Sequence, residues 1–197
     1  MRLGDDLLVS GVLFVNPETL SAIFENSKSN LPPQTASVEV ISPTRLLVNV
    51  PGIAEDADAM HEWAVGLYKL AVLVAQPGLP VLPTGGVYIA LAPIITVTPL
   101  SAPAGNINLT VKCAPRLLPE QEAQTSLIFG SRPVLPASII TPLDVTQPTT
   151  LTFTVPAVVA GEYMVRLRVE GIDSLPVIVS GSPAQLDLDP SQKVTVV

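Results

Sequence analysis

Few residues of this sequence could take part in chemistry, and its histidine and cysteine are the first to consider. His61 is the only histidine, and it lies beside Glu62 in an acidic segment. A histidine with carboxylates can bind a metal ion, but no second soft ligand accompanies it. A solvated or helix-capping histidine is the simpler interpretation. Cys113 is the only cysteine and has no neighbouring histidine to activate it, so we expect a buried thiol at the end of a strand.

Carboxylates and glycine-rich motifs add little to this set. Asp144, Asp187 and Asp189 offer oxygen ligands for calcium, but the Leu-Asp alternation that ends at Asp189 lacks the glycine-bearing loop of a calcium site. The sequence has no G-x-S-x-G, no phosphate-binding glycine loop and no cysteine pairs with zinc spacing. We therefore predict no catalytic residue, no metal site and no cofactor, and a protein that is not an enzyme.

The elements that would position such residues occur twice in the chain. Three pairs of segments match in the same order along the chain. The two members of the last pair are closer in sequence than those of the first two pairs, because the first copy carries extra residues in an acidic insertion, residues 52–64. We predict a tandem of one fold, with domains at residues 1–92 and 93–197. The matching pairs are SAIF (21–24) with SLIF (126–129), LLVNVP (46–51) with LTFTVP (151–156), and GLYKLAVLV (66–74) with GEYMVRLRV (161–169).

The pattern within each copy predicts an all-β fold made of two tandem immunoglobulin-like β-sandwiches. Each copy contains about seven short strands, separated by turn signals every ~8–12 residues. Many of the 21 prolines border these strands, where a missing N–H does least harm. In the second copy the alternation places Tyr163, Val165 and Leu167 on the core face and Arg166 and Arg168 on the solvated face. The long strand of each copy is expected at residues 66–75 and 163–169. Residues 134–140 are expected to form an edge strand, and residues 175–179 a strand that follows the turn at 171–174. Only the insertion is expected to contain helix.

One tyrosine in each copy is placed as in a tyrosine corner. Tyr68 and Tyr163 stand two residues before Leu70 and Val165, where antibody domains have a core cysteine. An aliphatic residue thus replaces the disulfide position. We predict that both tyrosines have a structural role, with the hydroxyl bonded to backbone upstream.

The outward face of the same strand differs between the copies. In the first copy it contains Leu67, Ala71 and Leu73, which are apolar where the second copy is charged. Either a loop or the insertion of this chain covers that face, or another chain does. These three residues are therefore a candidate interface.

Charge and hydropathy exclude two classes of partner. The net charge is −7 and no basic run occurs, so nucleic acid is not expected as a partner. No apolar run approaches the ~20 residues of a membrane helix, so no membrane span is expected. The first residues lack the pattern of a signal peptide, which predicts a cytoplasmic protein.

The repeated pattern resembles immunoglobulin-like domains of the IPT/TIG type. More narrowly, the second copy is similar to the C-terminal region of tail-terminator (cap) proteins of phage-tail-like contractile injection systems. The likeness is carried by residues 151–156, by Gly161, Glu162 and Tyr163 with residues 165–169, and by EGIDSLP at residues 170–176. The segment LGDDL at residues 3–7, followed by Gly11, is similar to the opening of that region.

This resemblance implies a non-enzymatic structural module with protein partners in a larger assembly, such as a phage-tail-like particle. It carries no catalytic residues to transfer. The family's N-terminal domain, which would sit on the tail and form oligomers, has no counterpart here, so the resemblance implies a fragment or a stand-alone relative.

Two other functions remain open from the sequence. One is a generic immunoglobulin-like binding module for a carbohydrate or a protein. Aromatic residues are only 4% of the chain, and Trp63 is the one candidate for a sugar platform. The other is an enzyme, which would require a cleft with convergent polar groups.

Overall fold

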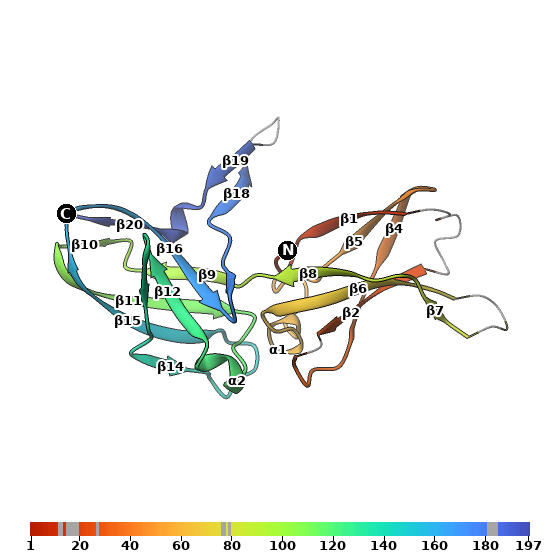
Figure 1. The fold of residues 1–197 in the computed structure, drawn as a ribbon, viewed down its shortest axis with the longest axis horizontal. Coiled ribbons are helices and arrows are strands. Elements are labelled where there is room, and N and C mark those ends of the chain that lie inside the picture. The colour runs from red at the N-terminus through yellow and green to blue at the C-terminus, as the bar shows by residue number, and fades with distance from the viewer. Residues whose placement is uncertain (12–13, 15–19, 27, 76–77, 79, 181–184) are drawn as a thin grey trace. The chain divides into compact units, whose positions relative to one another are not determined.

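The computed structural model describes the chain except for residues 12–13, 15–19, 27, 76–77, 79 and 181–184. The described residues form two compact units, Met1–Leu91 and Ala92–Val197. Strands dominate both units, and the helices are single turns (Figure 1). The chain is therefore all-β, as the alternating pattern predicts.

The second unit contains two packed sheets. One has the strand order β14-β15-β11-β9, and the other has the order β10-β20-β16-β12-β13, with β17 paired to β16. All pairs are antiparallel except β10 with β20. The bounds are β9 Ile94–Thr98, β10 Ser101–Ala102, β11 Gly105–Ala114, β12 Thr125–Phe129, β13 Arg132–Val134, β14 Ser138–Ile140, β15 Thr149–Val158, β16 Gly161–Val169, β17 Ile172–Asp173 and β20 Lys193–Val196.

This strand order is that of the immunoglobulin sandwich. If β9 is taken as strand A, the first sheet has the order D-E-B-A, and the second has G-F-C beside it, as in that fold. The inward residues of the central strands are fully buried, among them Leu109, Phe153 and Leu167. Each such side chain contributes roughly 1.5–3 kcal/mol by leaving water.

The first unit follows the same plan with fewer strands. One sheet has the order β1-β5-β4, and the other has β3-β2-β6, with β7 and β8 also paired to β6. A one-turn helix, α1, lies in the acidic insertion, as its composition predicts. The bounds are β1 Asp6–Ser10, β2 Leu20–Asn26, β3 Gln34–Ala36, β4 Val38–Ser42, β5 Arg45–Asn49, α1 Ala59–Glu62, β6 Gly66–Val74, β7 Leu82–Pro83 and β8 Val87–Leu91.

The registers show that the two units are copies of one fold. Phe24 lies opposite Leu70 in the first unit, and Phe129 lies opposite Val165 in the second, so the repeated segments pair with the same register. The strands β5 and β15 contain another repeated segment. In the first unit Leu46 of β5 lies opposite Val9 of β1, and in the second unit Leu151 of β15 lies opposite Val111 of β11. The strands of one unit can therefore be assigned to those of the other residue by residue.

The structure corrects two expectations about local elements. Helix is not confined to the insertion: α2, Pro119–Glu122, also forms, with proline at its first position and the Leu118 N–H bonded to Gln121 Oε1 at 3.2 Å. The segment 134–140, expected as one edge strand, belongs to two strands, β13 and β14, which lie in different sheets. Pro136 interrupts it, and proline cannot continue a ladder.

Candidate interaction surface

A two-stranded ribbon, β18 (Val177–Ser180) with β19 (Gln185–Leu188), connects β17 to β20 in the second unit. Among the described residues neither strand pairs with the two sheets of the unit, and Figure 1 shows the ribbon extending beyond them. Cross-strand partners share one face of a ribbon. The pairs Val177↔Leu188 and Val179↔Leu186 therefore form a single apolar face.

That apolar face is open to solvent. Val179 is 66% exposed, Leu186 73% and Leu188 60%. The opposite face contains the pair Ile178↔Asp187 and the side chain of Gln185. An isolated two-stranded ribbon is only marginally stable in water, so an apolar face on such a ribbon gains most from burial against a partner. We call residues Val177, Val179, Leu186 and Leu188 the ribbon face.

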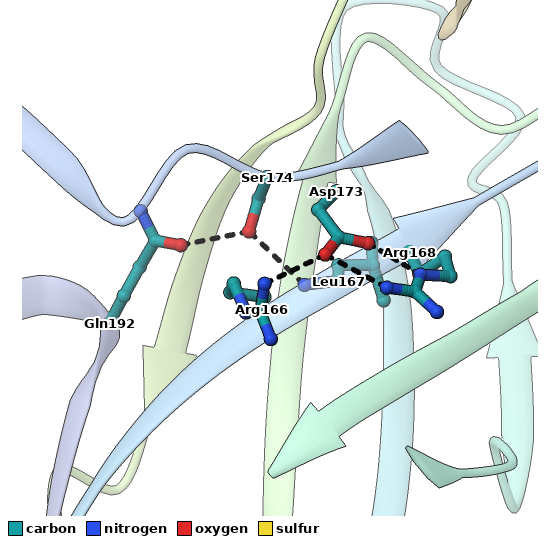
Figure 2. Close-up of polar contacts among 6 residues, drawn as sticks. All are labelled: Arg166, Leu167, Arg168, Asp173, Ser174 and Gln192. Atoms are coloured by element: carbon teal, nitrogen blue, oxygen red, sulfur yellow. Dashed lines mark hydrogen bonds and ion pairs between the residues drawn. The ribbon is translucent and has the colours of Figure 1, made fainter. Parts of the chain in front are cut away.

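The base of the ribbon is fixed by a buried polar network (Figure 2). The Ser174 hydroxyl accepts a hydrogen bond from the Leu167 N–H (3.1 Å) and donates one to Gln192 Oε1 (2.8 Å). Gln192 Nε2 donates to the Leu175 carbonyl (2.7 Å) and to Asp189 Oδ2 (2.9 Å). Ser174 and Gln192 are 1% and 3% exposed, and these bonds satisfy their side chains.

A cluster of charges holds the preceding turn. The Asp173 carboxylate accepts hydrogen bonds from Arg166 Nη1 (2.9 Å) and Arg168 Nε (2.6 Å), as Figure 2 shows. Hydrogen bonding to Asp173 raises the pKa of Arg168 above its ordinary value. Glu170 and Gly171 have φ of 49° and 85°, the left-handed conformations of a tight hairpin turn. The chain therefore leaves β16 in a defined direction toward the ribbon.

The two signature tyrosines bind backbone four residues upstream. The Tyr68 hydroxyl donates to the Ala64 carbonyl and accepts from the Ala64 N–H, both at 3.0 Å, and burial raises its pKa. The Tyr163 hydroxyl donates to the Val159 carbonyl at 3.0 Å. Each ring also packs against the phenylalanine of its copy, Phe24 or Phe129.

The apolar outer face of β6 is only partly exposed. Ala71 is buried at 5% exposure, Leu73 is half-buried, and Leu67 is 45% exposed. The chain itself therefore covers Ala71. Of the three residues of that candidate interface, Leu67 alone is open enough for a direct contact with a partner.

The residues considered for chemistry lie apart from one another. Cys113 is fully buried, its Sγ donates to the Pro115 carbonyl at 3.6 Å, and burial raises its pKa to about 12. His61 Nδ1 lies 3.9 Å from the Asp58 carboxylate. Asp144 accepts hydrogen bonds from Thr146, which lowers its pKa. Within the described part of the chain, no three His, Cys, Asp or Glu residues gather as a metal site would require.

The structure also places the single tryptophan. Trp63 is 2% exposed and packs edge-on against Phe24, with ring centroids 5.1 Å apart. It belongs to the core of the first unit, so the interpretation of Trp63 as a sugar platform is wrong. Tyr88, on β8, is an aromatic side chain that does reach solvent, with 68% exposure.

The ribbon face was missed by reasoning from the sequence. Leu175–Val179 was expected to be a strand of the sandwich, whereas the strand is β18 and pairs only with β19 among the described residues. The available signal was the alternation Leu186-Asp187-Leu188-Asp189, which is typical of a strand with one apolar face. Considered as a calcium motif, the same alternation does not indicate a ribbon.

Comparison with known proteins gives a family without a known function. Residues 89–196 match the family described as "Domain of unknown function (DUF8756)", and the chain belongs to it. No curated protein matches. In the described residues no helix has the length and apolarity to cross a membrane.

Several solved structures are similar at low identity. A Bacteroides ovatus mixed-linkage glucan utilization locus protein, SGBP-B in complex with a mixed-linkage heptasaccharide, is 16% identical with a TM-score of 0.33, over 100% of this chain and 42% of that chain. An ICAM-5 ectodomain fragment is 13% identical with a TM-score of 0.31, over 100% of this chain and 50% of that one. The fibronectin(III)-like modules of Clostridium thermocellum CbhA are 10% identical with a TM-score of 0.26, over 99% of this chain and 86% of theirs. This chain therefore spans half or less of the first two, and at these scores the likenesses carry no argument about its ligand.

Proposed function

We propose that the chain is a non-enzymatic protein-interaction module and that the ribbon face is its contact surface. The observation that carries this proposal is the position of three exposed apolar side chains, Val179, Leu186 and Leu188, on one face of a ribbon with a buried polar base. Exposed apolar patches beside polar residues mark interaction sites. The fixed base limits the entropy lost when a partner orders the ribbon.

We propose further that this module belongs to a phage-tail-like contractile particle, as the immunoglobulin-like region of its cap protein. The support is the resemblance to that region of Gly161, Glu162 and Tyr163 with residues 165–169, and of EGIDSLP at residues 170–176. The second of these segments forms β17 and the base of the ribbon. Residues that carry the resemblance therefore lie next to the proposed contact surface in the chain.

The test compares two neighbouring substitutions that add the same charge to opposite faces. Leu186→Asp charges the ribbon face, whereas Gln185→Asp charges the opposite face. Burying an unpaired carboxylate is strongly unfavourable, so we expect Leu186→Asp to reduce incorporation into sedimenting particles more than about tenfold. Gln185→Asp should incorporate like the wild type.

The readout is the fraction of tagged chain that co-sediments with particles from cells that produce them. Equal incorporation of both variants would exclude the ribbon face as the contact surface. A wild-type chain that stays monomeric in those cells and binds glycan arrays would replace this proposal with the carbohydrate-binding alternative.

A further inference from the structure

In the second unit the strand β9 completes one edge of the sandwich. It pairs antiparallel with β11, with Val97 opposite Val111 and Ile95 opposite Cys113. The side chains of Ile95 and Val97 are 4% and 2% exposed, so they fill the space between the two sheets at this edge. The backbone of β11 thereby has a partner on both sides.

The first unit lacks this strand among its described residues. Val9 corresponds to Val111, because both lie opposite the equivalent residues Leu46 and Leu151. By the same register Gly11 corresponds to Cys113. The position of β9 would thus run beside residues 8–11, yet β1 pairs only with β5 within the part of the chain that the structure describes.

In the described part of the chain, the outer edge of β1 has no strand partner. The Val50 N–H donates to the Asp5 carbonyl and the Gly11 N–H donates to the Thr44 carbonyl, so the odd-numbered residues of β1 face β5. Leu8 and Ser10 therefore direct their N–H and C=O groups outward. Leu8 is 58% exposed. An exposed edge of this kind is a template for a further strand.

A cavity lies where the side chains of that strand would enter. It measures about 260 Å³, and its lining includes Val9, Gly11, Phe14, Leu70, Val72 and Val87. None of the described lining residues carries a charge. The cavity is larger than the ~150 Å³ apolar cavity that accepts benzene, so it has room for branched apolar side chains. Val87, 58% exposed, forms part of its open side.

The second unit shows which occupant fits. The position of β10 is partly taken in the first unit, because the Met1 amine donates to the Ala90 carbonyl at 2.8 Å. Thr195 and Val196, which pair with β10, correspond to Ala90 and Leu91. Among the described residues of the first unit, the position of β9 is therefore the open one. Its counterpart in the second unit is an extended segment with two inward β-branched residues, Ile95 and Val97. The Phe14 ring lies where a Cβ of Gly11 would stand, so Phe14 forms one wall of the cavity.

We propose that the edge of β1 is a strand-acceptor site, at which an extended apolar segment of a partner polypeptide adds antiparallel to β1. Main-chain hydrogen bonds to Leu8 and Ser10 supply affinity, and the cavity selects β-branched side chains at alternate positions. The cavity and the ribbon face have no residue in common. This site is therefore separate from the proposed contact surface.

The experiment uses the whole chain and a labelled peptide with the sequence of residues 93–100, PIITVTPL, as the probe. We expect saturable binding by fluorescence anisotropy, together with slowed hydrogen exchange at the amides of Leu8 and Ser10. A scrambled peptide should not bind. Absence of saturable binding to the wild type, or protection elsewhere without change at Leu8 and Ser10, would overturn the proposal.

Two proline variants locate the site. Leu8→Pro removes an outward N–H of β1 and should weaken binding about tenfold or more. Val38→Pro places the same ring at the start of β4, on the other edge of the same sheet, and should change binding less than about twofold. Circular dichroism of both variants checks that they fold. Equal binding by both folded variants would place the peptide elsewhere, and Leu186→Asp should leave its affinity unchanged.

Discussion

At the scale of single residues, Tyr68 and Tyr163 occupy equivalent positions but different environments. Tyr68 is 2% exposed, and its hydroxyl satisfies both the N–H and the C=O of Ala64. Tyr163 is half-buried, and its hydroxyl donates to the Val159 carbonyl. We therefore expect the same tyrosine corner to stabilise the two units to different extents.

We predict that Tyr68→Phe costs about 1–3 kcal/mol of the unfolding free energy, because it leaves buried backbone groups without a partner. Tyr163→Phe should cost about 0.5–1.5 kcal/mol, since water can replace the lost hydroxyl. Denaturant unfolding of both variants beside the wild type measures the difference. An equal or reversed order of the two costs would show that the hydroxyl bonds do not determine it.

At the scale of elements, the connection from β16 to β20 depends on the buried pair Ser174 and Gln192. On this edge of β16, residues 161–164 pair with β20 and residues 168–169 pair with β17. Residues 165–167 lie between these two pairings, and the Leu167 N–H is bonded by the Ser174 side chain instead of by a strand. A side chain thus takes the place of a strand at this point of the sheet. Loss of that hydroxyl should loosen the base of the ribbon.

We predict that Ser174→Ala destabilises the chain by about 1–3 kcal/mol, because it leaves the Leu167 N–H and Gln192 Oε1 unsatisfied in a buried place. Ser101→Ala, at an exposed position of β10 in the same unit, is the matched control and should stay within about 0.5 kcal/mol of the wild type. Thermal unfolding and hydrogen exchange at Leu167 measure the effect. Unchanged exchange at Leu167 would mean that the network does not hold this turn.

Element types were predictable from the sequence more readily than strand partners. The sequence predicts the signature strands at residues 66–75 and 163–169, because alternation over such a length is a strong signal. In the structure β6 ends one residue earlier and β16 begins two residues earlier than these bounds. The apolar run at Leu175–Val179 predicted a strand but not its neighbour, since alternation does not specify which strand pairs with which. For this reason the sequence does not predict the ribbon or the candidate surface on it.

At the scale of the whole molecule, the chain consists of two units with their own cores. Unit Ala92–Val197 has both sheets completed by β9 and β10, and the family match covers residues 89–196. A domain with its own core can fold alone. The unit Met1–Leu91, by contrast, has an open edge at β1 among its described residues.

We predict that the fragment 92–197 folds cooperatively, with a midpoint of thermal unfolding within about 5 °C of the corresponding transition in the whole chain. The fragment 1–91 should unfold at a lower temperature than 92–197, and the PIITVTPL peptide should raise its midpoint by mass action. Differential scanning calorimetry of both fragments and the whole chain checks this. A disordered 92–197 fragment would show that the units are not independent.

The link from β16 to β20 has one further consequence, which concerns how such a protein can diversify. The equivalent link in the first unit connects β6 to β8, and both links contain additional strands. The link in the first unit contains β7, and the link in the second unit contains β17 and the ribbon. Doubling the length of such a link costs only about 0.6 kcal/mol of closure entropy. Natural variation and protein engineering can therefore exchange this segment for others, giving one scaffold new recognition properties.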